Sequence, residues 1–200
     1  MAFASTVARR LYLSIYNWVL FFGWARVLYC TIWALLGSAH ENVYAAIEKP
    51  LLLAQTAASL EWLVKSPLSA TFPQLAGSLT HSHFLVIPLA LSWSITEIIR
   101  YPFFGLKEAF GVTPSWLLWL RYNTFVVLYP VGLVSEVGLY FVAMPDMKTS
   151  ETYSLRMGNF SFNLFYASAL IIALYIPGFP HNYIYMLGRR EKVLSKAKIA

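Results

Sequence analysis

Five apolar stretches constrain this sequence more than any other feature. They cover residues 11–36, 50–64, 84–99, 116–144 and 160–176. A membrane-crossing helix needs about 20 predominantly apolar residues, and the longest stretches exceed that length. Hydrophobic residues make up 58% of the chain and charged residues 12%, whereas a soluble domain has about 25% charged residues. The sequence therefore predicts an all-α, polytopic membrane helix bundle that forms a single domain over residues 1–200.

Basic residues at both chain ends set the expected orientation. Arg9 and Arg10 precede the first stretch, and five of the 15 Lys and Arg residues lie between Arg189 and Lys198. Because basic flanks stay in the cytosol, both termini should be cytosolic, which requires an even number of spans. Five stretches do not satisfy this. Either residues 116–144 form a broken or re-entrant pair around Pro130, or the region 65–83 hides or has lost a span.

Tyr129 and Glu136 are the candidate site residues inside the fourth stretch. An ionisable residue in a membrane segment is costly and is a functional-site hypothesis by default. Glu136 has no basic residue within four positions on either side, and a desolvated carboxyl is suited to acid–base catalysis. Seven helical residues return to the same face about 10 Å along the axis, so the two side chains should share a face. The alternative is an interfacial tyrosine plus a glutamate paired with an arginine.

Residues 121–136, with the sequence RYNTFVVLYPVGLVSE, form the most specific motif. This run resembles the signature of the very-long-chain 3-hydroxyacyl-CoA dehydratases, a family formerly called protein tyrosine phosphatase-like. The resemblance covers nearly the whole chain, and the sequence is similar to the plant PASTICCINO-type branch of the family. Further matching segments are YNW at 16–18, ENVY at 41–44, SWSITEIIRY at 92–101 and YIYMLG at 183–188.

The region 62–83 departs from the family pattern. The family fold implied by the resemblance has six helices with both termini cytosolic. Here the third span is shortened or missing, because Pro67, Pro73, Gly77 and a polar SLTHS run leave no apolar segment of spanning length between Lys65 and His83. Loss of this span would explain the count of five.

The resemblance implies a lyase that removes water from very-long-chain 3-hydroxyacyl-CoA to give trans-2-enoyl-CoA. This is the third step of fatty-acid elongation, which also supplies chains for sphingolipids. In the family, the tyrosine and glutamate at the positions of Tyr129 and Glu136 are the proposed catalytic pair, and no cofactor or metal is needed. The CoA phosphates would face basic residues such as Lys107 or Arg121. The implied partners are the other elongation-cycle enzymes and the lipid bilayer.

The resemblance also implies residence in the endoplasmic reticulum membrane as a multi-pass protein. Lys196 and Lys198 lie five and three places from the end, which resembles a dilysine retrieval signal, an address and not an anchor. The alternative is a generic basic tail.

Other functions fit the sequence less well. The family's older name suggests a tyrosine phosphatase, but that chemistry needs a Cys-x5-Arg loop, and after Cys30 the position of the arginine is occupied by Leu36. The net charge of +6 is not arranged as a basic stripe with aromatics, so no nucleic-acid partner is expected. A di-iron oxygenase needs histidine clusters, and a transporter would show repeats. The remaining alternative is a catalytically impaired relative that acts as a non-enzymatic partner of the elongase complex.

Overall fold

The computed structural model describes residues 2–37, 42–62, 81–149, 154–157 and 160–199. The described part of the chain forms five helices and one short β-hairpin, which confirms the helix bundle predicted from the sequence. The helices are α1 (Ala2–Gly37), α2 (Val43–Trp62), α5 (Val86–Phe110), α6 (Ser115–Thr149) and α7 (Leu164–Ile199), and the strands are β1 (Ser154–Met157) and β2 (Phe160–Asn163).

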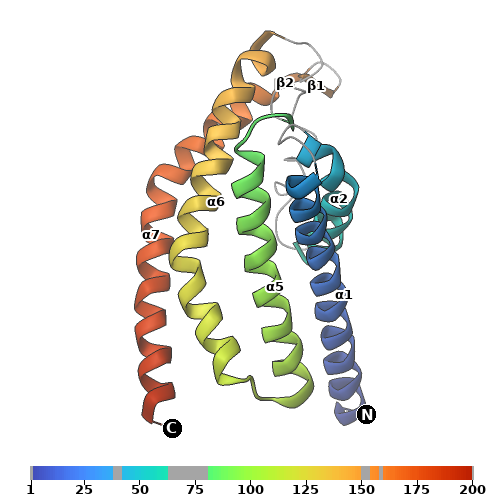
Figure 1. The fold of residues 1–200 in the computed structure, drawn as a ribbon, viewed down its shortest axis with the longest axis vertical. Helices are drawn as coiled ribbons and strands as arrows, with labels where there is room; N and C mark the ends of the chain where they lie inside the picture. The colour runs from blue at the N-terminus through green and yellow to red at the C-terminus, as the bar shows by residue number, and fades with distance from the viewer. Residues whose placement is uncertain (1, 38–41, 63–80, 150–153, 158–159, 200) are drawn as a thin grey trace.

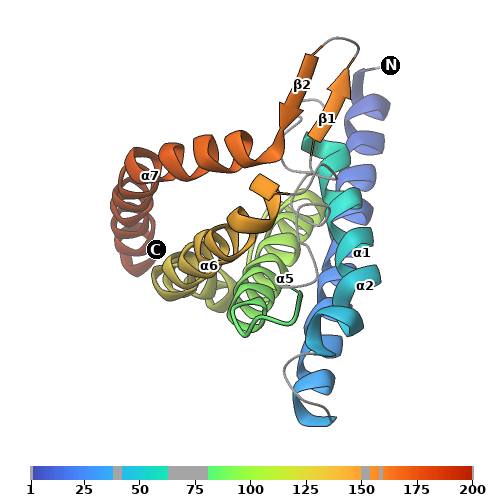
Figure 2. The ribbon, with the colours of Figure 1, turned by 90° about the horizontal axis from the view of Figure 1, so that it is seen from above.

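The helices α5, α6 and α7 lie in this order across the molecule, and α1 crosses obliquely on the other side of α5 (Figures 1 and 2). The helix α2 packs against α1. Figure 1 shows that α1, α5, α6 and α7 alternate in direction, so that α1 begins and α7 ends at the same end of the molecule. This arrangement agrees with the prediction that both termini face one side of the membrane.

Three of the described helices are long and apolar enough to cross a membrane. They are the segments Val7–Gly37 of α1, Ser115–Lys148 of α6 and Ser168–Ser195 of α7. Residues 63–80 lie outside the described residues. They contain most of the region in which the sequence predicts a shortened or missing span.

An apolar core joins α1, α2 and α5. Leu20 and Val27 of α1 are buried against Ile47 of α2 and Leu89 of α5. Tyr101 of α5 is 2% exposed in the same cluster. These contacts fix the position of α5 and, through it, the start of α6.

The helix α6 corrects one prediction about topology. It runs unbroken from Ser115 to Thr149 through Pro130, so the broken or re-entrant pair around Pro130 is wrong. Proline removes one backbone donor, but a membrane helix tolerates this because neighbouring helices and local adjustments satisfy the freed carbonyl.

The helix α7 corrects the predicted boundaries of the last apolar stretch. That stretch was expected to begin at Phe160 and to stop at Pro177. Instead, Phe160–Asn163 pairs with Ser154–Met157 as an antiparallel hairpin, and the helix continues through Pro177 and Pro180 to Ile199. Figure 2 shows α7 changing direction between its orange and dark red halves, as expected where prolines interrupt the hydrogen-bond ladder.

Two helices also extend beyond the predicted apolar stretches. The helix α5 continues past Ile99 to Phe110 and is capped by Gly111, whose φ of 75° is the left-handed conformation that glycine adopts readily. The helix α2 begins at Val43, seven residues before the stretch 50–64. Both extensions bury further apolar side chains, such as Phe103 of α5 and Ile47 of α2.

Candidate active site

Tyr129 and Glu136 both face α7 from the same side of α6. The Tyr129 ring stacks on Phe179, with 5.2 Å between ring centroids, and on Tyr183, with 6.3 Å between centroids. The Glu136 carboxylate accepts a hydrogen bond of 2.9 Å from the Tyr175 hydroxyl. The shared face expected from their seven-residue spacing is therefore present.

Tyr175 is a member of this arrangement that sequence analysis missed. It lies in the apolar part of α7, where a tyrosine carries no distinguishing signal. Its hydroxyl is bonded to Glu136 and lies within electrostatic range of the Tyr129 and Tyr140 hydroxyls. To predict this contact one must know how the antiparallel helices α6 and α7 are aligned, because that alignment makes residues 136 and 175 neighbours.

The Glu136 carboxyl is partly buried and is surrounded by tyrosines. Tyr140, one turn further along α6, lies within electrostatic range of it. No lysine or arginine in the described part of the chain pairs with Glu136. The alternative of a structural glutamate–arginine pair therefore has no support among these residues. A carboxyl held by a phenol in an apolar setting can exchange protons with a bound substrate.

The contact between α6 and α7 continues on both sides of this pair. We call it the α6–α7 seam, meaning residues 123–147 of α6 with residues 165–190 of α7. At one end the Arg190 guanidinium donates two hydrogen bonds, of 3.1 and 2.7 Å, to the Asn123 side-chain oxygen. At the other end Met147 lies in an apolar cluster with Phe165. The candidate pair occupies the middle of the seam.

A cavity of about 570 Å³ lies between α5, α6 and α7 near one end of the seam. Both residues that the sequence suggested for CoA phosphates, Lys107 and Arg121, line it, together with Arg100 and Arg189. Arg121 is eight residues from Tyr129, or about 12 Å along the helix axis. The residues that line the cavity are Thr96, Ile99, Arg100, Phe103, Phe104, Lys107, Arg121, Tyr122, Thr124, Phe125, Met186 and Arg189.

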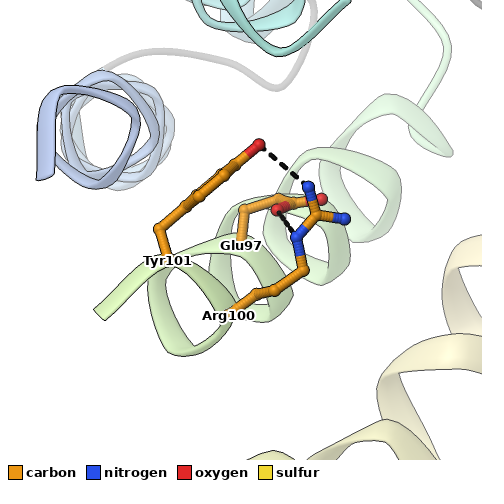
Figure 3. Close-up of polar contacts among 3 residues, drawn as sticks. All are labelled: Glu97, Arg100 and Tyr101. Carbon is orange, nitrogen blue, oxygen red and sulfur yellow. Dashed lines mark hydrogen bonds and ion pairs between the residues drawn. The ribbon is translucent and has the colours of Figure 1, made fainter. Parts of the chain in front are cut away.

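Arg100 is held in place by two neighbours on α5 (Figure 3). Its Nε lies 2.9 Å from the Glu97 carboxylate, a pairing that a spacing of three residues on one helix favours. Its Nη2 donates a hydrogen bond of 2.9 Å to the Tyr101 hydroxyl. Because Tyr101 belongs to the apolar core, this network ties the edge of the cavity to the core.

The described residues include no group of three His, Cys, Asp or Glu side chains that could hold a metal ion.

Comparison with known proteins identifies the family. The family model "Protein tyrosine phosphatase-like protein, PTPLA" matches residues 53–196, which include α6 and the candidate pair. The chain belongs to the PTPLA family. No solved structure matches the chain.

The PTPLA relatives carry names that state an activity. The chain is 58% identical to the rice protein "Very-long-chain (3R)-3-hydroxyacyl-CoA dehydratase PASTICCINO 2A", with 100% of each chain covered. It is 56% identical to PASTICCINO 2 of Arabidopsis thaliana, with 99% of each chain covered. It is 36% identical to the human very-long-chain (3R)-3-hydroxyacyl-CoA dehydratase 2, over 92% of this chain and 81% of the human protein.

The alignment with the rice protein is longer than this chain. It extends over 221 positions and covers all 200 residues of this chain, so 21 positions have no residue here. The expectation that one span is shortened or missing stays a prediction.

Proposed function

We propose that this protein removes water from very-long-chain 3-hydroxyacyl-CoA to give trans-2-enoyl-CoA, the third step of the fatty-acid elongation cycle. One observation carries the proposal: a partly buried tyrosine and an uncompensated glutamate share the α7-facing side of α6. The chain that contains them is 58% identical along its full length to a protein named as such a dehydratase.

The reaction needs two proton-handling groups. A base removes a proton from C2 of the substrate, the C3–O bond breaks, and an acid protonates the departing hydroxyl so that it leaves as water. The electrons of the C2–H bond form the new double bond between C2 and C3. The thioester carbonyl acidifies the C2 proton, but this effect is insufficient without a positioned base.

Tyr129 and Glu136 are proposed as these two groups. Tyr129 exchanges a proton with the substrate, and Glu136 is its acid–base partner. The Tyr175 hydroxyl fixes the orientation of the Glu136 carboxylate through the 2.9 Å hydrogen bond. The substrate would lie along the α6–α7 seam, where both side chains are within its reach.

The proposed location is the endoplasmic reticulum membrane, in contact with the other elongation-cycle enzymes. The basic end of α7 and the start of α1 lie at one end of the molecule (Figure 1), so a cytosolic end would present Lys196 and Lys198 to a retrieval receptor. Replacing both lysines by serine should move the protein out of this compartment, and an unchanged location would assign retention to another signal.

The second candidate is a catalytically impaired relative that serves as a non-enzymatic subunit of the elongase complex. The shortened or missing third span expected from the sequence favours it, because loss of one span would uncover faces of its neighbouring helices.

One assay separates the two candidates. The purified protein in lipid nanodiscs is given (3R)-3-hydroxyacyl-CoA substrates of increasing chain length, and formation of the conjugated enoyl thioester is followed. Turnover that depends on Glu136 supports the dehydratase. A complete absence of turnover, in a protein that still co-purifies with elongation enzymes, supports the non-enzymatic subunit.

A further inference from the structure

The cavity between α5, α6 and α7 is strongly positive. Four of its lining side chains are cationic: Arg100, Lys107, Arg121 and Arg189. None of the described lining residues is acidic. Cations converging from three helices on one cavity repel one another, and a polyanionic ligand would relieve that repulsion.

Arg121 is the central cation of this cavity. It is partly buried, and its guanidinium lies 4.5 Å from the ring centroids of both Phe103 and Phe104. In the described part of the chain no carboxylate forms an ion pair with it. Its guanidinium is hydrogen-bonded to Tyr122, and because an arginine carries five N–H donors in a planar fork, donors remain for a forked anion such as phosphate.

Arg100 supplies a second, positioned cation. Glu97 and Tyr101 hold its guanidinium (Figure 3), and it lies close enough to Arg121 for the two charges to repel. Glu97 forms an ion pair with Arg100, and the residues that line the cavity include four cations and no acidic side chain. The cavity keeps a surplus of positive charge.

Packed aromatic rings connect the cavity wall to the candidate pair. Phe125 lines it and contacts the Tyr183 ring, with 6.2 Å between centroids. Tyr183 in turn stacks on Tyr129. A ligand with phosphates at Arg121 and an extended arm along the seam would therefore present its far end to Tyr129, about 12 Å away along α6.

We propose that this cavity binds the phosphates of the CoA handle and thereby sets the position of the thioester at Tyr129. The assignment rests on the proposed function, since that function supplies an acyl-CoA as the ligand. A phospholipid headgroup offers the same phosphate chemistry. CoA is the occupant we assign because the cavity lies at one end of the α6–α7 seam that holds the candidate pair, with Arg121 about 12 Å from Tyr129 along α6.

The test compares two thioesters of the same 3-hydroxyacyl chain. One is the CoA thioester and the other is the pantetheine thioester, which has the same reacting end but no phosphate. Arg121→Gln should raise KM for the CoA thioester roughly tenfold, which corresponds to the loss of one charge-assisted hydrogen bond. It should leave kcat within about twofold and leave KM for the pantetheine thioester unchanged. Lys107→Gln, at an exposed position, should act in the same direction with a smaller effect.

The matched control is Lys148→Gln, which removes the same charge from the other end of α6. It should match the wild type with both thioesters. Equilibrium binding of free CoA and of pantetheine, measured on the same preparations, adds a readout that does not require turnover. Arg121→Gln should weaken CoA binding alone.

The possible failures are distinguishable. If the wild type turns over the CoA thioester and both cavity variants keep its KM and its CoA affinity, the cavity assignment is wrong and the proposed function stands. If the wild type turns over neither thioester but binds CoA through Arg121, the proposed reaction is wrong and the cavity assignment stands. If the variants differ from the wild type only when anionic phospholipid is added to phosphatidylcholine nanodiscs, a lipid headgroup occupies the cavity and the assignment is wrong.

Discussion

The α1–α2–α5 side of the molecule and the α6–α7 seam differ in the hydrogen bonds that cross between their helices. On the first side, hydroxyls bond to backbone carbonyls. Ser14 of α1 donates to the Gly105 carbonyl of α5 at 3.3 Å, and Tyr16 of α1 donates to the Ala57 carbonyl of α2 at 2.9 Å. Such bonds satisfy buried hydroxyls without creating a reactive group.

In the seam, polar side chains meet one another instead. Tyr175 bonds to Glu136 across the two helices, and Arg190 bonds to Asn123. Side chain to side chain bonds are the rarest class of hydrogen bond in folded proteins. The same two helices also carry the stacked Tyr129 and Tyr183 rings. We propose that the first side is a scaffold and that the seam is where the chemistry occurs.

The sharpest way to break this comparison is to remove the proposed reactive groups. Tyr129→Phe and Glu136→Gln should each lower kcat by roughly 10²- to 10⁴-fold, the contribution of one acid or base. Because neither residue belongs to the scaffold core, both variants should accumulate in membranes with nearly unchanged thermal stability. The measurement is enoyl-thioester formation together with Tm in detergent.

Tyr166→Phe and Glu191→Gln are the matched controls, since both positions are exposed on α7. They should retain full turnover. Near-normal kcat in both Tyr129→Phe and Glu136→Gln would remove this pair from the mechanism.

A scaffold substitution should show the converse pattern. Leu20 is 1% exposed within the core of α1, α2 and α5, and Leu20→Ala should cost about 2–5 kcal/mol of unfolding free energy because it leaves a cavity. KM of the protein that remains folded should not change. Leu11→Ala is the control, because Leu11 is 59% exposed on the same helix, and an equal loss of stability in both variants would contradict the scaffold assignment.

Tyr175→Phe should have a smaller effect on the seam than removal of Tyr129 or Glu136. The phenyl ring keeps the packing but removes the hydroxyl that orients Glu136. Loss of a hydrogen bond to a charged group is worth about 1.5–3 kcal/mol, so kcat should fall roughly tenfold or more while KM changes little. The pH dependence of kcat should shift as well, because the partner of the titrating carboxyl has changed. An unchanged kcat and pH profile would make Tyr175 a packing residue.

The helical bundle was predictable because apolar length and charge placement determine it. Periodicity also placed Tyr129 and Glu136 on one face, since that inference depends only on 3.6 residues per turn. The predicted helix boundaries are less accurate. The sequence predicts a helix end at Pro177, whereas α7 continues through it as a bent helix. Proline is a weaker helix breaker where neighbouring helices satisfy the backbone groups that it leaves unbonded.

Tyr175 and Arg100 were outside the reach of the sequence for a different reason. Their roles depend on which residue of another helix, or which wall of a cavity, they meet. Such pairings follow from the antiparallel register of α6 with α7 and from the crossing of α5. No local pattern in either segment encodes them.

The smallest expected effect is on the pH dependence of stability, at His81 beside α2 of the scaffold. The His81 ring stacks on Tyr44, with 3.7 Å between ring centroids. Its Nε2 is buried and has no hydrogen-bond partner among the described residues. Burial lowers the pKa of His81, and the nearby Glu48 carboxylate opposes this only in part. The folded protein therefore binds a proton at His81 less readily than the unfolded chain does.

The sign of the pH dependence follows from this difference. As pH falls through the ordinary histidine pKa of about 6.5, the unfolded chain takes up a proton first, so the free energy of unfolding decreases. Tm measured at about pH 8 and about pH 5.5 should fall less in His81→Phe, which keeps the ring against Tyr44, than in the wild type. His181→Phe, at an exposed position on α7, should keep the wild-type difference because its ring is already solvated in the folded state. A His81→Phe protein with the full wild-type pH dependence would show that this buried edge of the scaffold does not couple folding to protonation.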